Sequence, residues 1–491
     1  MIDYNISKEW EIVTFRYGKR VTAFVTALCL ILGLLVISPG FPDQAKAENQ
    51  DPVVKKVVPT FTGDTKTSKG FTWYTMLEST GSDLQVVKKT GKKKPDFRKA
   101  IKFTGTSYVS TNDSGERVHK AEATGLKANT EYYYRVGDEK MNIWSDTGLV
   151  KTSKKNGAFT FLELTDPQAK TEEEGLLAAS TFNIAAQTVK NYDFMTVTGD
   201  FVDNGVVEDE WDWLINNSKK VWGNTTVVPA AGNHEGKNNA FIDHFNVKPA
   251  ASNTDTTTDA YYSFDYSNTH FTVLNTNEDS EEFRDFTPAQ VNWMTSDIKA
   301  AKAAGAKWTV VLIHKGPYTT SNHATDDDII DPNGVRNKIA PLIGKLGVDL
   351  VIQGHDHIYA RSLPVNGDNE ATQPATITEW LNGQQIDYSV NPDGSIYFIP
   401  ATAGPKVYKK NIDPVLGDNF YSKFVRAEEN HALKYGLDPS NPTRPVRGAI
   451  QNFTSVKVEK DRITVVVYEI DRIKGGAPYI VDQFGIQKDG K

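Results

Sequence analysis

Residues 348–357 read Val-Asp-Leu-Val-Ile-Gln-Gly-His-Asp-His, an apolar run that ends in a glycine and two closely spaced histidines. The branched aliphatic residues of this run favour a short buried strand. Side chains alternate along extended backbone, so the imidazoles of His355 and His357 can lie on one side while Asp356 points away. The segment therefore predicts a buried strand that presents two nitrogen ligands at its carboxyl end.

Four further apolar runs along the chain also end in a metal-binding type of residue. These residues are Asp166, Asp200, Asn233 and His314. Taken singly, an Asp or Asn after a strand usually forms a turn, and a histidine there is usually an ordinary hydrogen-bonded side chain. Their repetition at strand ends favours one shared metal site, because ligands gather at the carboxyl ends of strands in α/β folds.

Three glycines directly precede the proposed ligands. They are Gly199, Gly232 and Gly354. Glycine lets the backbone turn sharply and approach a bound ion closely. The glycines therefore support the prediction that these strand ends surround an ion.

Candidate helices and apolar strands follow one another along the chain, and the strands are apolar on both faces. This pattern indicates an α/β domain. Candidate helices lie at 171–190, 208–219 and 288–304. The runs lie at 158–165, 192–198, 225–231, 270–276, 307–313, 348–353 and 395–401.

Residues 55–153 show a different pattern. Short runs of alternating apolar and polar residues are separated by turn residues, as in a β-sandwich. The stretch 126–136 resembles the tyrosine corner of fibronectin type III domains, with Ala128 where that family usually has proline. Tyr132 and Tyr134 are therefore expected to be structural. Residues 151–157 read as a linker between this domain and the next.

The second domain is expected to span 158–480 and to include a C-terminal hairpin built from 453–458 and 463–468. Residues 405–447 are polar and without a clear period, which predicts a long excursion over the surface.

Residues 1–47 are typical of an export signal. Lys19 and Arg20 precede an apolar run over 21–37, and Ala45-Lys46-Ala47 supplies a small-x-small cleavage pattern. An uncleaved membrane anchor is the alternative, although the run is short for a span. Cleavage would remove Cys29, the only cysteine, so any metal would be held by nitrogen and oxygen. We expect an exported bacterial protein, secreted or associated with the cell envelope or surface.

The bulk composition fits a globular protein of more than one domain. Of 491 residues, 39% are hydrophobic, and the formal net charge is −7. An acidic protein is not expected to bind nucleic acid non-specifically, because such binding needs a basic surface. Nucleic acid is therefore expected only as a substrate, if at all, and the oligomeric state is left open.

Together these motifs resemble a known family. Gly199-Asp200, Gly232-Asn233-His234-Glu235, the apolar run before His314, and Gly354-His355-Asp356-His357 occur in the order found in calcineurin-like metallophosphoesterases. The chain is more similar still to purple-acid-phosphatase-like members that carry an N-terminal fibronectin-like domain. The resemblance covers 70–485. It implies a β-sandwich core flanked by helices, preceded by an all-β domain.

The resemblance also implies a site of two divalent or mixed-valence metal ions, Fe, Mn or Zn, about 3.5–4 Å apart. Asp200 would bridge the ions. Asp166 and His357 would complete one metal site. Asn233, His314 and His355 would complete the other.

Catalytic roles are implied for residues beside the metals. His234 would face the leaving-group oxygen and protonate it. His323 lies nine residues after His314, where related phosphatases often place a phosphate-contacting histidine. Tyr359 and Arg361 are expected to support the site rather than to touch substrate.

Two positions depart from the family pattern. Asp203 stands where purple acid phosphatases have a tyrosine, so the iron(III) charge-transfer colour is not expected. Gln168 stands where other members have a histidine, which leaves the first metal site short of a strong ligand. Gln168 or Asp203 is therefore a candidate extra ligand, directly or through water, or a residue that supports the ligands.

The predicted function is hydrolysis of a small phosphate monoester by attack of a hydroxide held by the two metal ions, without a covalent enzyme intermediate. Phosphodiester or nucleotide hydrolysis at the same site is the first alternative. The second is an inactive extracellular binding protein, which the weakened first metal site would explain.

Overall fold

The computed structural model describes residues 54–236, 239–427, 431 and 433–488. The predicted export signal at 1–47 lies outside these residues. The chain from Val53 to Lys491 forms one compact unit. Within the described residues, no helix has the length and apolarity needed to cross a membrane.

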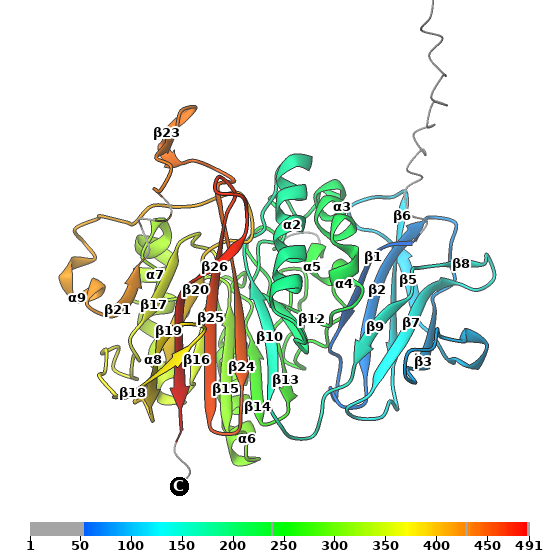
Figure 1. The fold of residues 1–491 in the computed structure, drawn as a ribbon, viewed down its shortest axis with the longest axis horizontal. Coiled ribbons are helices and arrows are strands. Elements are labelled where there is room, and N and C mark those ends of the chain that lie inside the picture. Colours follow the sequence, from blue (N-terminus) through cyan, green and yellow to red (C-terminus); the bar gives the residue numbers. More distant parts are fainter. Residues whose placement is uncertain (1–53, 237–238, 428–430, 432, 489–491) are drawn as a thin grey trace, which may run out of the picture. The chain divides into compact units, whose positions relative to one another are not determined.

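Two mixed β-sheets form the core of the molecule (Figure 1). The first has twelve strands in the order β18-β19-β26-β25-β24-β10-β11-β12-β1-β2-β6-β5, and the second has seven in the order β13-β14-β15-β16-β20-β17-β21. The strands of the first sheet are β18 Ala375–Leu381, β19 Gln384–Val390, β26 Pro478–Gln487, β25 Arg462–Asp471, β24 Ile450–Val458, β10 Phe159–Leu164, β11 Phe194–Val197, β12 Val227–Pro229, β1 Val54–Thr60, β2 Lys69–Met76, β6 Glu116–Ala123 and β5 Thr106–Val109. Those of the second are β13 Tyr262–Tyr266, β14 Thr269–Val273, β15 Trp308–Ile313, β16 Leu350–Gln353, β20 Ile396–Pro400, β17 Tyr359–Ser362 and β21 Phe424–Ala427.

The strands predicted from apolar runs are present, and those that carry the proposed ligands are parallel within each sheet. Strands β10, β11 and β12 are parallel neighbours in the first sheet. Strands β14, β15, β16 and β20 are parallel neighbours in the second. Carboxyl ends of parallel neighbours lie at the same edge of a sheet, so this arrangement gathers the polar residues that follow them.

The predicted helices are also present, and the capping residues explain where they begin. In α2, Glu172–Thr188, the Thr171 hydroxyl accepts a hydrogen bond from the Glu174 amide. Thr287 caps α6, Pro288–Ala303, in the same way, with proline in its first turn. The remaining α-helices are α3 Glu208–Asn217, α4 Lys219–Trp222, α5 Ala240–His244, α7 Asp327–Ile330, α8 Ala340–Lys345 and α9 Gly417–Tyr421.

Apolar side chains from both sheets and from the helices form the interior. One cluster joins Phe161 and Phe194 of the first sheet to Phe271 of the second, and Phe182 of α2 belongs to it. A second cluster lies between the second sheet and helices α6 and α8, with Met294 and Ile343 among its members. The order of layers is helix, sheet, sheet, helix, which confirms the predicted sandwich flanked by helices.

The N-terminal region is all-β, as predicted. Strands β1, β2, β6 and β5 of the first sheet face a smaller sheet across a core that includes Phe71, Trp73 and Tyr134. The smaller sheet contains β4 Ile101–Thr104, β3 Asp83–Lys88, β7 Glu131–Asp138, β8 Ile143–Trp144 and β9 Gly148–Lys151. The predicted tyrosine corner is present, since the Lys127 amide donates to the Tyr132 hydroxyl at 2.9 Å.

Strand β1 connects this N-terminal region to the rest of the first sheet. It pairs in parallel with β12 and antiparallel with β2, so one sheet runs across the predicted boundary. The buried ammonium of Lys56 forms ion pairs with Glu116 at 2.9 Å, with Glu208 at 2.6 Å and with Asp212 at 3.3 Å. Hydrogen bonding and charge therefore hold the two regions together.

Only part of the polar stretch at 405–447 is an excursion over the surface. It contains α9, the edge strand β21, and a two-stranded hairpin of β22, Leu437–Asp438, and β23, Asn441–Pro445. Its first residues are not at the surface, because Val407 and Tyr408 are buried. The predicted C-terminal hairpin is β24 and β25, which pair from Ile450↔Asp471 to Val458↔Ile463.

The buried ring of His270 in β14 lies between an exposed carboxylate of β13 and a partly exposed carboxylate of α6. Its two ring nitrogens lie 2.8 Å from Asp265 and 2.8 Å from Asp297. Burial lowers the pKa of His270, but these carboxylates more than compensate and raise it from 6.5 to about 9. The imidazolium therefore stabilises the fold fully below pH 6.5, and this stabilisation is lost as the pH rises through about 9.

We predict that His270→Gln lowers the free energy of unfolding by about 1–2 kcal/mol at pH 6.5, and by clearly less at pH 10. Urea unfolding followed by tryptophan fluorescence would measure the difference. His119→Gln is the matched control, because His119 is held by the hydroxyls of Thr75 and Ser82 rather than by carboxylates. Its cost should be the same at pH 7 and pH 10. A pH-independent cost for His270→Gln would contradict the prediction.

Candidate metal centre

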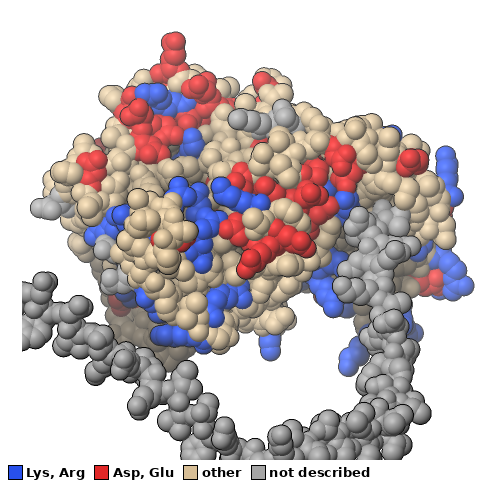
Figure 2. All heavy atoms as spheres, turned by 90° about the horizontal axis from the view of Figure 1, so that it is seen from above, with Lys and Arg blue, Asp and Glu red and all other residues tan. Residues whose placement is uncertain are grey.

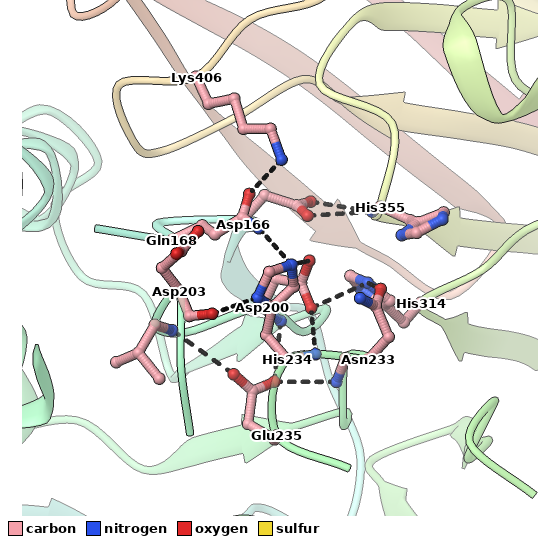
Figure 3. Close-up of polar contacts among 12 residues, drawn as sticks. Asp166, Gln168, Asp200, Asp203, Asn233, His234, Glu235, His314, His355 and Lys406 are labelled. Atoms are coloured by element: carbon pink, nitrogen blue, oxygen red, sulfur yellow. Dashed lines mark hydrogen bonds and ion pairs between the residues drawn. The ribbon is translucent and has the colours of Figure 1, made fainter. Parts of the chain in front are cut away.

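The loops after β10, β11, β12, β15 and β16 meet at one edge of the two sheets (Figure 3). Ligand atoms of Asp200, His314 and His355 lie within 4.8 Å of one another, and so do those of Asp166, Asp200 and His357. Asp200 belongs to both groups. The structure thus brings together five of the predicted ligands, which come from four separate strand ends.

Asn233, the remaining predicted ligand, lies at the side of the first group. Its amide oxygen is 3.2 Å from His314 Nε2, which is also 3.2 Å from Asp200 Oδ1. Asn233 is exposed, whereas Asp200 and His314 are buried. Its oxygen can therefore complete the ligand set from the solvent side.

The histidine rings are oriented by backbone carbonyls. His314 Nδ1 lies 2.7 Å from the Thr198 carbonyl, and His357 Nδ1 lies 2.8 Å from the Lys406 carbonyl. A carbonyl only accepts hydrogen bonds, so each Nδ1 carries a proton and each Nε2 keeps its lone pair when the ring is neutral. His357 Nε2 is buried without a hydrogen-bond partner, which is the environment of a nitrogen that coordinates an ion.

Charges within the site affect one another strongly. Burial would raise the pKa of Asp200, but the nearby His314, His234 and His355 rings hold it well below its usual range. Burial lowers the pKa of His314, and the Asp200 carboxylate raises it to about 9. Protonation of His314 and coordination of a cation compete for the same nitrogen, so cation affinity should fall in acid.

The ligand loops adopt left-handed backbone conformations. Asp166, Asp200 and His355 have φ of 51°, 49° and 70°, which are rare for residues with a side chain. Hydrogen bonds hold them, since the His355 amide donates to the Asp166 carboxylate at 3.0 Å and the His234 amide donates to Asp200 at 3.1 Å. Strain held in place by surrounding structure is typical of functional sites.

The three predicted glycines lie where no side chain fits. A Cβ on Gly199 would lie 2.3 Å from His314 Nδ1, and a Cβ on Gly232 would lie 2.2 Å from the Asp200 amide nitrogen and Oδ1. A Cβ on Gly354 would lie 2.5 Å from the Thr198 carbonyl oxygen. The glycines therefore allow the ligand loops to pack against one another.

His234 lies beside the ligand groups and is not a member of either. Its Nε2 is 3.7 Å from Asp200 Oδ2, and its Nδ1 contacts the backbone carbonyl of Asp203. The Gln168 amide lies against His234 Nε2. This placement suits a residue that contacts substrate near the metals rather than one that binds them.

The two departures from the family pattern both contact His234. Asp203 orients His234 through its backbone oxygen, while its carboxylate pairs with Lys170 at 3.3 Å. The Gln168 side chain contacts His234 and accepts a hydrogen bond from Lys406 Nζ at 3.2 Å. Both residues therefore support neighbouring groups in this structure.

His323 contributes to a third cluster at the edge of the site. Its ring packs on His355 with ring centroids 3.9 Å apart, and its Nδ1 lies 2.6 Å from Asp326. Ligand atoms of His323, Asp326 and His355 also lie within 4.8 Å of one another. His323 is thus adjacent to the proposed ligands, where it can face a bound phosphate.

Tyr359 and Arg361 lie away from the ligands. The Tyr359 hydroxyl donates to Asp482 at 2.6 Å, and Arg361 Nε pairs with the same carboxylate at 2.8 Å. These contacts join β17 to β26 and so link the two sheets. The expectation that both residues support the site stays a prediction.

Three residues of the site lack a recognisable role in the sequence. Glu235 is buried and accepts hydrogen bonds from the amides of Asp200 at 3.0 Å, Gly232 at 3.0 Å and Phe201 at 2.9 Å. Burial and the Asp200 carboxylate raise the pKa of Glu235 well above its usual range. Glu235 stands in the quoted Gly232–Glu235 motif, so its position could have been noticed.

Lys406 and Tyr408 are the other two. The Tyr408 ring lies 4.8 Å from that of His357, and Lys406 points toward Gln168 (Figure 3). Both residues come from the stretch that the sequence assigns to a surface excursion. That assignment is wrong for the first residues of the stretch, because they pack against His357. No local signal in the sequence marks them.

The donor set fits a pair of cations. It consists of carboxylate and amide oxygens with imidazole nitrogens, which suits Mn, Fe or Zn. The buried carboxylates of Asp166 and Asp200 form no ion pair with a lysine or arginine among the described residues, so cations would compensate their charge. Asp166 and His357 would hold one ion, Asn233, His314 and His355 the other, with Asp200 between them.

We predict that Gly199→Ala destabilises the protein by about 3 kcal/mol or more and removes most of the bound metal, because the new methyl group displaces His314. Gly305→Ala is the matched control. The two glycines have φ of 98° and 96°, but a Cβ on Gly305 meets nothing within 4 Å. Its cost should be about 1 kcal/mol, with unchanged metal content. Urea unfolding and elemental analysis would compare them, and equal effects would contradict the prediction.

Comparisons with known proteins agree with this geometry. Residues 159–359 match the calcineurin-like phosphoesterase family, and residues 54–152 match the purple acid phosphatase N-terminal domain. Purple acid phosphatase 18 of Arabidopsis thaliana is 25% identical over 314 residues, which are 62% of this chain and 66% of that protein. The chain spans 66%, 57% and 63% of the length of three such plant relatives.

Two solved structures share the fold. The purple acid phosphatase of yellow lupin seeds has a TM-score of 0.67 at 16% identity, covering 89% of this chain and 75% of its own. PhoD has a TM-score of 0.61 at 14% identity, covering 90% and 92%. The matches to the two domain families confirm the family resemblance seen in the motifs. The chain carries a calcineurin-like phosphoesterase domain preceded by a purple acid phosphatase N-terminal domain.

Proposed function

We propose that this protein hydrolyses phosphate esters at a centre of two metal ions. The observation that carries the proposal is that Asp200 belongs to two adjacent ligand groups, with His314 and His355 in one and Asp166 and His357 in the other. Two-metal hydrolases use such an arrangement to hold the ions close together. When bound, the ions supply Lewis-acid stabilisation of the phosphoryl oxygens and an activated water.

Side chains of the protein would orient the substrate and protonate its leaving-group oxygen. His234 lies beside Asp200 and outside the ligand groups, and its Nε2 would protonate the leaving-group oxygen once the substrate replaces the contact of Nε2 with the Gln168 amide. His323, held by Asp326, would contact the phosphate. The attacking group would be water, so no side chain of the protein acts as the nucleophile.

In this proposal the substrate is a small phosphate monoester. The protein would act outside the cell, as a secreted or envelope-associated enzyme. Support comes from relatives that are named purple acid phosphatases and from the export pattern at 1–47. Matched monoester and diester substrates would test the preference, and activity on diesters alone would overturn it. Retained metal without turnover of any phosphate ester would instead favour a binding protein.

We predict that Asp200→Asn lowers the metal content from about two equivalents to one or fewer and lowers kcat/KM by about a thousandfold or more. The amide removes the negative charge shared by both ligand groups. Elemental analysis of protein purified without chelator, together with phosphatase assays, would measure both effects.

Asp203→Asn is the matched control for this change. Its carboxylate pairs with Lys170 and its contact with His234 uses the backbone oxygen, so metal content should be unchanged and activity should fall by no more than about threefold. Full activity of Asp200→Asn, or loss of metal in Asp203→Asn, would count against the proposed site.

We predict that His234→Ala keeps the metal ions and lowers kcat for an alkyl phosphate by about 10²–10⁴-fold. The loss should be much smaller for nitrophenyl phosphate, whose leaving group needs no proton. Steady-state kinetics with the two substrates would show the difference. Equal losses for both substrates would exclude the assigned role of His234 as a proton donor.

A further inference from the structure

Lys406 is held in place by the loops that carry the proposed ligands. Its carbonyl accepts from His357 Nδ1 at 2.8 Å, and the Tyr408 amide donates to the His357 carbonyl at 3.0 Å. Upstream, the Thr402 hydroxyl donates to the Asp166 carbonyl at 2.8 Å. These are contacts of the backbone or of other side chains, so the Lys406 side chain is not needed to hold the loop.

The Lys406 side chain points into the site on the side of His234 (Figure 3). Its ammonium donates to Gln168 Oε1 at 3.2 Å and lies 5.1 Å from the Tyr408 ring centroid. The other end of the Gln168 amide contacts His234. Lys406 is therefore on the side of the site that the proposed mechanism gives to the leaving group.

This ammonium lacks a carboxylate partner within the part of the chain that the structure describes, and a neutral amide is its hydrogen-bond acceptor. A half-buried cation without an anionic partner is costly unless something compensates it. Two bound metal ions would use the charge of Asp166 and Asp200, so these carboxylates would not compensate Lys406. Asp203, the third carboxylate that raises the pKa of Lys406, already pairs with Lys170 at 3.3 Å. An anion from outside the protein would.

A second positive charge reinforces this environment. Burial lowers the pKa of Lys406, the carboxylates of Asp200, Asp166 and Asp203 raise it, and the charge of Arg444 in β23 lowers it further. Strand β23 stands at the top of Figure 1, on the face that Figure 2 shows from above. On that face, groups of basic and acidic side chains lie side by side.

We propose that Lys406 binds a second anionic group of the substrate, carried by the leaving group, and so makes the enzyme selective for phosphate esters with an anionic leaving group. The anion would be a carboxylate or another phosphate, and Lys406 would replace its bond to Gln168, or share it, with a charge-assisted bond to the substrate. This inference rests on the proposed phosphoesterase function and adds the substrate class.

Two pairs of substrates differ in the charge of the leaving group. Phenyl phosphate and 4-carboxyphenyl phosphate differ by one carboxylate on the leaving group. A nucleoside monophosphate releases a neutral nucleoside by cleavage of an ester bond, whereas the corresponding diphosphate releases an anionic monophosphate by cleavage of an anhydride bond, so each variant is compared with the unchanged protein on the same substrate. The two pairs also show whether the site prefers a carboxylate or a phosphate.

We expect Lys406→Met to lower kcat/KM by about tenfold or more for the anionic member of at least one pair, and by less than about twofold for both neutral members. Lys406→Arg should keep most of the preference, because it keeps the charge. Lys409→Met is the matched control, since Lys409 is exposed and lies on the same loop. Its kinetics should equal those of the unchanged protein.

Equal losses on neutral and anionic substrates, no loss on any of them, or the same pattern in Lys409→Met would overturn the inference and leave the phosphoesterase function standing. If the unchanged protein hydrolyses none of the four substrates, the proposed function fails. Calorimetric titration of the manganese-loaded protein with the methylene analogue of the nucleoside diphosphate then tests Lys406 separately. Binding that weakens about tenfold in Lys406→Met supports the inference, and unchanged binding overturns it.

Discussion

Two buried carboxylates, Asp166 and Asp200, lie close together where neighbouring strands end, and the rest of the site is arranged around their charge. Placing two carboxylates in a nearly dry environment is unfavourable unless cations or hydrogen bonds compensate them. Among the described residues, histidines and backbone amides surround them, and no lysine or arginine pairs with them. A pair of metal ions is the compensation that this donor set fits.

The packing of the two sheets offsets the free-energy cost of that arrangement. The ligand loops adopt left-handed conformations at Asp166, Asp200 and His355, each of which costs of order 1 kcal/mol or more. They persist because a parallel strand fixes the start of each loop and because the apolar cluster around Phe161, Phe194 and Phe271 keeps the sheets packed. Glycines at the closest approaches remove the side chains that would separate the loops.

Much of this could be predicted from the sequence, because the decisive signals are local. Apolar runs predict the strands, and a polar residue at the end of each run predicts a shared site once the strands are parallel. The capped helices α2 and α6 also follow from short patterns. Within the site, the motif order identifies the candidate ligands without any knowledge of distances.

Features that depend on distant segments could not be predicted in this way. The pairing of β1 with β12 joins Thr60 to Val227 and carries one sheet across a boundary that the linker pattern suggested. Lys406 and Tyr408 lie in a polar stretch without a period, and their role depends on hydrogen bonds to His357. Neither contact leaves a trace in the residues nearby along the chain.

The departures from the family pattern acquire a physical meaning once these contacts are known. Gln168 and Asp203 both contact His234, and Gln168 also connects it to Lys406. The ligands follow strand ends fixed by the two sheets, whereas Lys406 comes from the loop after β20. A residue in that loop can therefore change the charge that a substrate would meet without altering the donor set that the two ions would require.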